Sequence, residues 1–323
     1  MDWTQEVKEA RRRYIGGSDA AAILGISRYK SPLSVWAIKT GQTVSDNIDD
    51  VVAVKLGVKL EQAVAEFFME DTGKKVEPVT KEYCKKAGYK YIQYPNEKDV
   101  TILHPKYPFL GANIDRIVIG EDAGFEAKTT NQFKASEWEG EDMPAEYLLQ
   151  CIHYMAVTGI KTWYIGVLIG NMYFRWKKID YSEKIINDVI NKEVNFWNNF
   201  IVPKIMPMQI SSKDSTILYT LFPQAAPESI IELDDRAQQI CEFRDSALAD
   251  MKALKGQIDE YTNTLKAMLK TYEVGITKTY KVSWKNQKEH RLDTELLKKE
   301  EPGIYERYSP ETEKRVLRVS VKK

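Results

Sequence analysis

Residues 111–128 have the sequence GANIDRIVIGEDAGFEAK, and this stretch gives the strongest indication of the fold. It contains two short apolar runs joined by a tight turn, which predicts two adjacent β-strands over residues 113–119 and 124–129. Side chains alternate between the two faces of a strand, so Glu126 and Lys128 should point to the same side, with Ala127 between them. If the two strands pair, Asp115 comes to lie beside Glu126.

Two carboxylates beside a lysine suit magnesium-assisted hydrolysis of a phosphodiester. The carboxylates bind the cation, the cation activates water and neutralises the phosphate, and the ammonium group orients the attacking water. An isolated match to this spacing is more often a pair of solvated side chains on an exposed strand. Here Ile114, Ile117 and Phe125 indicate strands buried on at least one face, where a charged group needs a partner or a metal.

A third carboxylate lies on the amphipathic helix predicted over residues 56–70. The apolar stripe of this helix consists of Leu60, Val64, Phe67 and Phe68, and Glu61 lies at its border. Glu61 can therefore face the same site, although a glutamate at such a border can equally extend its carboxylate into solvent.

A second helix is predicted from Pro144 to Thr158. Tyr147, Gln150 and Tyr154 recur at helical spacing on a face away from its core stripe. They are either ordinary surface side chains or side chains that face the site and contact a phosphate or a metal-bound water.

A basic run, Arg11, Arg12 and Arg13, precedes a Gly-Gly turn and a short helix for which Ser18 is a candidate N-cap. Arginines beside a helix N-terminus form an anion site. The alternative, a surface basic run followed by a capped helix, is equally compatible with these residues.

The composition restricts the class of protein. The chain has 47 basic and 47 acidic residues among 323, and this balance argues against a DNA-coating protein that relies on many phosphate contacts. No apolar run could cross a bilayer, and the polar start is no secretory signal, so we expect a cytoplasmic protein without membrane contact. The three cysteines and three histidines are scattered, which speaks against zinc and iron–sulfur sites.

The proline-spaced residues 202–229 predict a linker between two domains, residues 1–225 and 226–323. After the linker, apolar residues alternate steps of four and three from Ala247 to Tyr272, a pattern typical of a coiled coil or helical hairpin. Short strands and a short helix follow, and residues 273–323 hold 13 basic and 9 acidic residues. This module either docks on the first domain or a neighbouring subunit, with its basic end extending the DNA track or holding a partner, or it is a self-contained hairpin with a solvated tail.

Taken in order, these features resemble the YqaJ-like viral recombinases, relatives of phage lambda exonuclease in the PD-(D/E)XK nuclease superfamily. The resemblance covers about residues 10–180. It rests on Arg11 through Ser18 with the following Asp-Ala-Ala, on Ser31-Pro32, Trp36 and Lys39-Thr40-Gly41, on Gly57-x-x-x-Glu61, on Asp115 with Glu126-x-Lys128, and on Gln150-x-x-x-Tyr154. The proline that the superfamily carries before its first aspartate is Ile114 here.

The resemblance implies an α/β fold with a restriction-endonuclease-like core, in which helices flank a mixed central sheet. The C-terminal helical-hairpin and α+β module that the residues predict is not part of the minimal nuclease of this family. It implies a 5′-to-3′ exonuclease that digests one strand of linear double-stranded DNA and leaves 3′ single-stranded tails for recombination by strand annealing. It further implies two Mg²⁺ ions, which Mn²⁺ can replace, a ring-shaped homo-oligomer, commonly a trimer, and a single-strand annealing partner in a phage-infected or prophage-carrying bacterium.

The resemblance also assigns roles to residues. Asp115, Glu126 and the Ala127 carbonyl bind metal, and Glu61 binds or supports the second ion. Lys128 positions the nucleophilic water, while Gln150 and Tyr154 support the site. Arg11, or its neighbours Arg12 and Arg13, and Ser18 receive a 5′-phosphate. Two alternatives remain: a structure- or sequence-specific endonuclease that uses the same metal site, and a non-catalytic DNA-binding scaffold of recombination.

Overall fold

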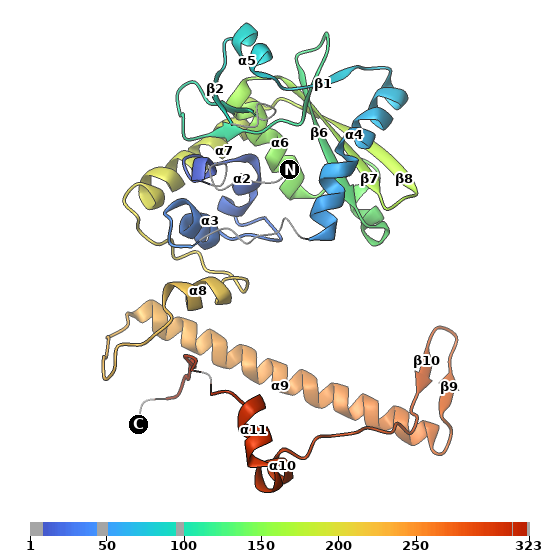
Figure 1. The fold of residues 1–323 in the computed structure, drawn as a ribbon. Helices are drawn as coiled ribbons and strands as arrows, with labels where there is room; N and C mark the ends of the chain where they lie inside the picture. Colours follow the sequence, from blue (N-terminus) through green and yellow to red (C-terminus); the bar gives the residue numbers. More distant parts are fainter. Residues whose placement is uncertain (1–8, 44–50, 95–99, 312, 322–323) are drawn as a thin grey trace. The chain divides into compact units, whose positions relative to one another are not determined.

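A computed structural model describes residues 9–43, 51–94, 100–311 and 313–321 (Figure 1). Its contacts divide the chain into two compact units, Met1–Phe222 and Pro223–Lys323, each of which is described by itself. The polar start of the chain, residues 1–6, and the last two lysines of its basic end lie outside the described residues.

The first unit is built on a five-stranded sheet with the order β1-β5-β6-β7-β8. The central strands β6 and β7 run parallel, and every other neighbouring pair is antiparallel, so the sheet is mixed. The turn between β7 and β8 contains Gly170 with a φ of 58°, a left-handed conformation that glycine adopts readily in hairpin turns. The strands are β1 Val76–Pro78, β5 Arg116–Val118, β6 Ala123–Thr130, β7 Thr162–Ile169 and β8 Tyr173–Asp180.

Helices cover both faces of this sheet. On one face, α4 (Val52–Thr72) packs Phe68 on Phe125 and Tyr164, with ring centroids 4.6 and 5.3 Å apart. On the other face lies α6 (Ala145–Thr158), the crossover between the parallel strands. The predicted α/β fold with a mixed central sheet flanked by helices is therefore confirmed, and its arrangement is that expected for a restriction-endonuclease-like core.

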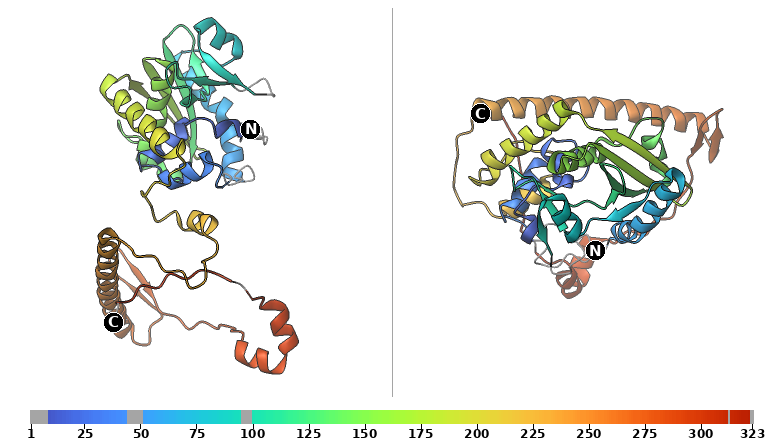
Figure 2. Two further views of the ribbon diagram at one scale, coloured as in Figure 1. Left: turned by 90° about the vertical axis from the view of Figure 1, so that its left-hand side faces the viewer. Right: turned by 90° about the horizontal axis from the view of Figure 1, so that it is seen from above.

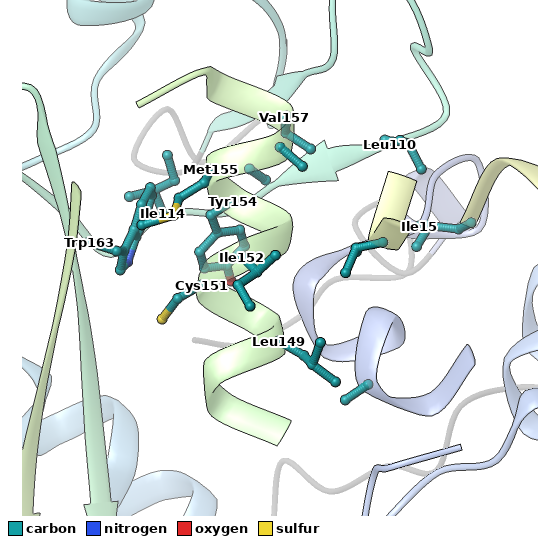
Figure 3. Close-up of a cluster of buried hydrophobic side chains, with 14 of the residues drawn as sticks. Ile15, Leu110, Ile114, Leu149, Cys151, Ile152, Tyr154, Met155, Val157 and Trp163 are labelled. Atoms are coloured by element: carbon teal, nitrogen blue, oxygen red, sulfur yellow. The ribbon is translucent and has the colours of Figure 1, made fainter. Parts of the chain in front are cut away.

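The helix α6 lies at the centre of the larger core. Figure 3 shows Ile114 and Trp163 on one side of α6 and Ile15 and Leu110 on the other. Residue 15 pairs with residue 110 in a parallel β-bridge, which fixes the N-terminal segment beside a small second sheet. This sheet consists of β2 Lys90–Gln93, β3 Val100–Leu103 and β4 Gly111–Ala112.

The remaining helices of the first unit surround this core. They are α2 Gly17–Ile23, α3 Pro32–Lys39, α5 Lys81–Ala87, the 3₁₀ turn η1 Gln132–Trp138, α7 Glu183–Phe196 with its π-helical continuation Trp197–Ile201, and α8 Ser215–Leu221. None of the helices in the described part of the chain combines the length and apolarity needed to cross a bilayer.

Several local expectations were wrong. The helix expected to start at Ser18 begins one residue earlier, with Gly16 as its N-cap, so Ser18 lies in the first turn and is exposed. The strand expected over 113–119 is interrupted, because β4 and β5 belong to different sheets. Phe67 is exposed, and Ala65 takes its place in the buried stripe of α4. The expected linker contains the short helix α8.

In the second unit, α9 (Asp235–Leu269) is one unbroken helix, as both views in Figure 2 show, so the hairpin alternative is wrong. The hairpin strands β9 (Val274–Ile276) and β10 (Lys281–Ser283) follow, and then the helices α10 (Thr294–Glu300) and α11 (Pro302–Tyr308). Of the short strands expected after the linker, the last, over residues 316–321, does not form, because no strand of the described chain pairs with these residues.

Candidate active site

The pairing of β5 with β6 brings the two predicted carboxylates together. Arg116 pairs with Phe125 in the antiparallel register, so Asp115, one residue earlier, lies level with the following Glu126. The backbone N–H of Ala127 donates a 2.8 Å hydrogen bond to Oδ2 of Asp115. The strand pair therefore fixes the position of Asp115 even though this residue lies outside the strand.

Glu126 is held through one of its two carboxylate oxygens. Lys128 Nζ lies 2.5 Å and Gln150 Nε2 2.6 Å from Oε1, and Gln150 Nε2 also donates to the hydroxyl of Tyr154 over 2.8 Å. The other oxygen, Oε2, is buried and has no hydrogen-bond partner among the described residues. A buried acceptor without a partner costs about 1–3 kcal/mol, so this oxygen is suited to bind a cation.

The charged groups of the site shift one another's pKa values. Burial, and then the charge of Asp115, raise the pKa of Glu126 to about 8. Burial likewise raises the pKa of Asp115. For Lys128, burial opposes the charged form, but the attraction of Glu126 and Asp115 is larger in sum and raises its pKa. Two carboxylates that resist ionising side by side form a site that a divalent cation would stabilise.

Asp115, Glu126 and Lys128 face a cavity of about 380 Å³, whose opposite wall comes from α4. Tyr147 also lines this cavity, and Lys128 Nζ lies 5.2 Å from the centre of its ring. Glu61 lines the cavity from α4, which is one of the two placements that its border position on the helix left open.

The carboxylate of Glu61 is paired with Arg116, whose Nη2 lies 3.1 Å from Glu61 Oε1 and 3.1 Å from Gln62 Oε1. In the described residues, no third acidic, histidine or cysteine side chain joins Asp115 and Glu126 in a metal-ligand cluster. The structure thus brings Glu61 to the cavity but not to the carboxylate pair.

The N-terminal motif forms a second charged cluster around Asp19. The buried Asp19 carboxylate is 2.7 Å from Lys39 Nζ and 3.2 Å from Lys30 Nζ, and it accepts a hydrogen bond from Gly16 N over 3.1 Å. Burial alone would raise the pKa of Asp19, but the charges of Lys39, Lys30 and Arg11 outweigh it and lower that pKa.

Arg11, one of the three candidate arginines, contributes to this cluster, because its charge helps to lower the pKa of Asp19. Its guanidinium lies close to the start of α2, 3.9 Å from where a Cβ on Gly16 would stand, and its backbone carbonyl accepts a hydrogen bond from Lys39 Nζ. Arg12 is half-buried and Arg13 is exposed. The sequence interpretation missed the roles of Lys30 and Lys39, because both lie in other elements and only the fold brings them to Asp19.

Gly17 connects the two clusters. A Cβ placed on Gly17 would stand 2.7 Å from Cε1 of Tyr154 and 2.8 Å from Cγ of Gln150. The first turn of α2 therefore lies directly against the side chains that hold Glu126. Space, rather than an unusual backbone conformation, requires glycine at this position.

Comparison with known proteins places the chain in a family. The YqaJ-like viral recombinase domain matches residues 6–161. The uncharacterized protein YqaJ of Bacillus subtilis (strain 168) is 33% identical over 310 residues, which cover 94% of this chain and 89% of that protein. The chain belongs to the YqaJ-like viral recombinase family. Because the similarity to YqaJ spans most of the chain, it extends into the second unit.

Two solved structures are similar to this YqaJ-like chain. The alkaline exonuclease LHK-Exo from Laribacter hongkongensis has 18% sequence identity and a TM-score of 0.48, covering 62% of this chain and 94% of its own. A phage-related exonuclease from Haemophilus somnus 129PT has 12% identity and a TM-score of 0.36, with coverages of 59% and 95%.

A second buried pair in the YqaJ-like chain was not anticipated from the sequence. His153 on α6 lies 2.8 Å through Nδ1 from Glu193 Oε1 on α7, and 3.0 Å through Nε2 from the carbonyl of Gly111. Burial disfavours the charged ring, but the neighbouring Glu193 carboxylate raises the pKa of His153 above its ordinary value. The pair joins α6 to α7 and β4 at the residue of α6 that precedes Tyr154.

We expect His153→Ala to lower the free energy of unfolding by about 3 kcal/mol, because it leaves a buried carboxylate without its partner. Urea denaturation followed by circular dichroism would measure the loss. The matched control is Lys178→Ala, which breaks the exposed Lys178–Asp180 ion pair and should cost less than about 1 kcal/mol. Equal losses in the two variants would contradict a stabilising role for His153.

Proposed function

We propose that this chain is a magnesium-dependent exonuclease that digests one strand of linear double-stranded DNA from its 5′ end. The observation that carries the proposal is the buried pair Asp115 and Glu126, with Lys128 beside it, at the wall of one cavity. Resected DNA with 3′ single-stranded tails is the substrate that a strand-annealing protein requires, and membership of a recombinase family supports this direction. We therefore also propose a single-strand annealing protein as partner.

The donor set fits a hard divalent cation. Asp115 and Glu126 supply carboxylate oxygens, Glu126 Oε2 is buried without a partner in the described chain, and no sulfur or imidazole ligand lies with them. We assign metal binding to these two side chains and the Ala127 carbonyl. Glu61, which lines the same cavity and is paired with Arg116, would support a second ion. Bound Mg²⁺, or Mn²⁺ in its place, would polarise the scissile phosphate and lower the pKa of water.

The protein residues supply the remaining chemistry. Lys128 stays protonated beside Glu126, so its ammonium group can donate to the attacking water and orient it toward phosphorus. Gln150 holds Glu126 Oε1 and is itself joined to Tyr154, which keeps the carboxylate in one rotamer. Precise placement of this kind contributes several kcal/mol to the rate of a displacement reaction.

One gel assay tests the function. Linear duplex with a 5′-phosphate, linear duplex with a 5′-hydroxyl, and covalently closed circular duplex are each incubated with Mg²⁺, with and without a chelator. We expect chelator-sensitive loss of linear duplex that leaves long single strands, and intact circles. Cutting of the circles would identify an endonuclease instead, and binding without cleavage would identify a scaffold.

We expect the 5′-phosphorylated end to be degraded about tenfold faster than the hydroxyl end, because Arg11 and Ser18 receive the phosphate through charge-assisted hydrogen bonds. Initial rates on the two ends would measure this preference. Arg11→Ala should abolish it, while Arg13→Ala, at an exposed neighbouring position, should retain it. A wild-type enzyme without preference would contradict the phosphate site. Loss of the preference in Arg13→Ala alone would transfer the role to that residue.

A further inference from the structure

The helix α9 carries an apolar stripe that none of the described residues of its own unit covers. Along its length only Leu269, at the C-terminal end, is buried. The stripe residues from Met251 to Met268 are each between 41% and 72% exposed, although they are large and apolar. These residues are Met251, Leu254, Ile258, Tyr261, Leu265 and Met268. A row of this kind on a soluble protein marks a contact surface.

The stripe has the spacing of a coiled-coil seam. Starting at Ala247, its residues alternate steps of four and three and occupy the a and d positions of successive heptads, with Met251 at a and Leu254 at d. The outer positions b, c and f are charged, polar or small, for example Lys252, Asp259 and Gly256. Between Met251 and Met268 the stripe is confined to a and d, because the e and g positions there are polar. So narrow a stripe fits another helix, whereas a helix that lies on a globular surface needs a wider apolar face.

The charged residues beside the seam indicate which helix is the partner of α9 and in which direction that helix runs. Asp250 occupies a g position and Lys255 the e position of the next heptad. In a parallel, in-register pair of identical helices, each g residue meets the e residue of the following heptad in the other helix. Asp250 of each copy then meets Lys255 of the other, and the apolar Phe243 meets Leu248 at the preceding turn.

An antiparallel pair does not produce this match. There, g positions face g positions and e positions face e positions. Between residues 240 and 269 the e positions are Cys241, Leu248, Lys255, Thr262 and Leu269, and the g positions are Phe243, Asp250, Gln257 and Thr264. No acidic residue stands at e and no basic residue at g, so no antiparallel register pairs opposite charges at these positions.

We propose that α9 forms a parallel, in-register coiled coil with the same helix of another copy of this chain. The seam from Ala247 to Met268 comprises about three heptads, roughly 30 Å of helix at 1.5 Å per residue. The seam residues are none of those assigned to the proposed nuclease site. The tests of this interface therefore need neither DNA nor metal, and their outcome does not depend on whether the proposed function is correct.

The first test is the mass of the full chain in solution. Light scattering after size exclusion should give a multiple of the 37.2 kDa chain mass. Ile258→Asp, at the centre of the seam, should lower this mass. The matched control Ala253→Asp places the same charge on the outer face and should leave the mass unchanged. A wild-type monomer, or a mass that Ile258→Asp leaves unchanged, would overturn the proposal.

The second test establishes direction. Leu254→Cys is introduced together with Cys241→Ser, which removes the partly exposed thiol of the helix while Cys84 and Cys151 remain buried. At a d position the two copies of residue 254 meet only in a parallel, in-register pair, so glutathione buffer should yield a disulfide-linked dimer on a non-reducing gel. Ala253→Cys in the same background should stay monomeric on that gel. Absence of the cross-link in an oligomeric protein would exclude the parallel arrangement.

The third test addresses the charged pair. Asp250→Lys should weaken association on the order of tenfold, because two attractive pairs become two repulsive ones. The double variant Asp250→Lys with Lys255→Asp should restore the wild-type dissociation constant at low salt. If α9 instead packs on the nuclease unit of its own chain, reversing both charges restores nothing, and this outcome counts against the proposal.

Discussion

Asp115→Ala and Glu126→Ala are each expected to lower the rate of DNA hydrolysis by at least about 10³-fold while the chain stays folded. If the proposed function is right, loss of either carboxylate would remove a principal ligand of the cation. The bound cation would contribute several kcal/mol to stabilising the transition state. The fold should survive, because removal of one acid from a crowded anionic pair relieves repulsion between Asp115 and Glu126. Initial rates on end-labelled duplex, together with thermal melting in chelator, would measure both effects.

The matched control for these two variants is Glu70→Ala, which removes a carboxylate from the exposed face of α4. It should change neither rate nor melting temperature. Glu61→Ala should lower the rate of hydrolysis by less than Asp115→Ala or Glu126→Ala does, because Glu61 lines the cavity but is paired with Arg116. Retention of full activity in Asp115→Ala or in Glu126→Ala would remove the basis of the metal site.

Gly17→Ala is expected to lower kcat on the order of 10²-fold with little change in KM. The added methyl group would stand 2.7 Å from Tyr154 and 2.8 Å from Gln150, so both side chains must shift. Gln150 then no longer holds Glu126 Oε1, and a displacement of about 1 Å at a catalytic group costs about two orders of magnitude. Steady-state rates on phosphorylated duplex would measure the effect.

A neighbouring glycine provides the control for this prediction. A methyl group on Gly16 would meet no atom closer than 3.6 Å, so Gly16→Ala should keep most of the activity. In a Tyr154→Leu background, where the ring is gone, Gly17→Ala should cost much less than it does in the wild type, because contacting residues give non-additive effects. Additive losses in the double variant would show that Gly17 acts through some other contact.

Regular patterns made part of the structure predictable. β6 and α6 begin and end within one residue of the predicted bounds, because the alternation of side chains in one and the helical stripe in the other are uninterrupted. The pairing of Asp115 with Glu126 followed from a tight turn between two strands. Predictions failed at 113–119, because an apolar run does not reveal that the chain passes from one sheet to another between Ala112 and Arg116.

The candidate site was predictable to the same degree. Residues on one strand or one helix, such as Glu126 with Lys128 and Gln150 with Tyr154, could be grouped because local geometry places them together. Lys39 with Asp19 could not, since their contact depends on how α2 packs beside α3. The contact of Gly17 with Tyr154 could not be predicted either, because a glycine carries no side chain whose pattern could indicate a neighbour.

The charges around Asp19 influence how fast a polyanion arrives. Arg11, Lys30 and Lys39 surround one carboxylate, which leaves an excess of two positive charges in one place on a chain that is neutral as a whole. Such a local field speeds diffusional encounter with a phosphate backbone over about 10 Å at 0.1 M salt, and it fades as ions are added. Capture of a DNA end should therefore slow with ionic strength, while a neutral net charge limits adhesion of the remaining surface to the duplex.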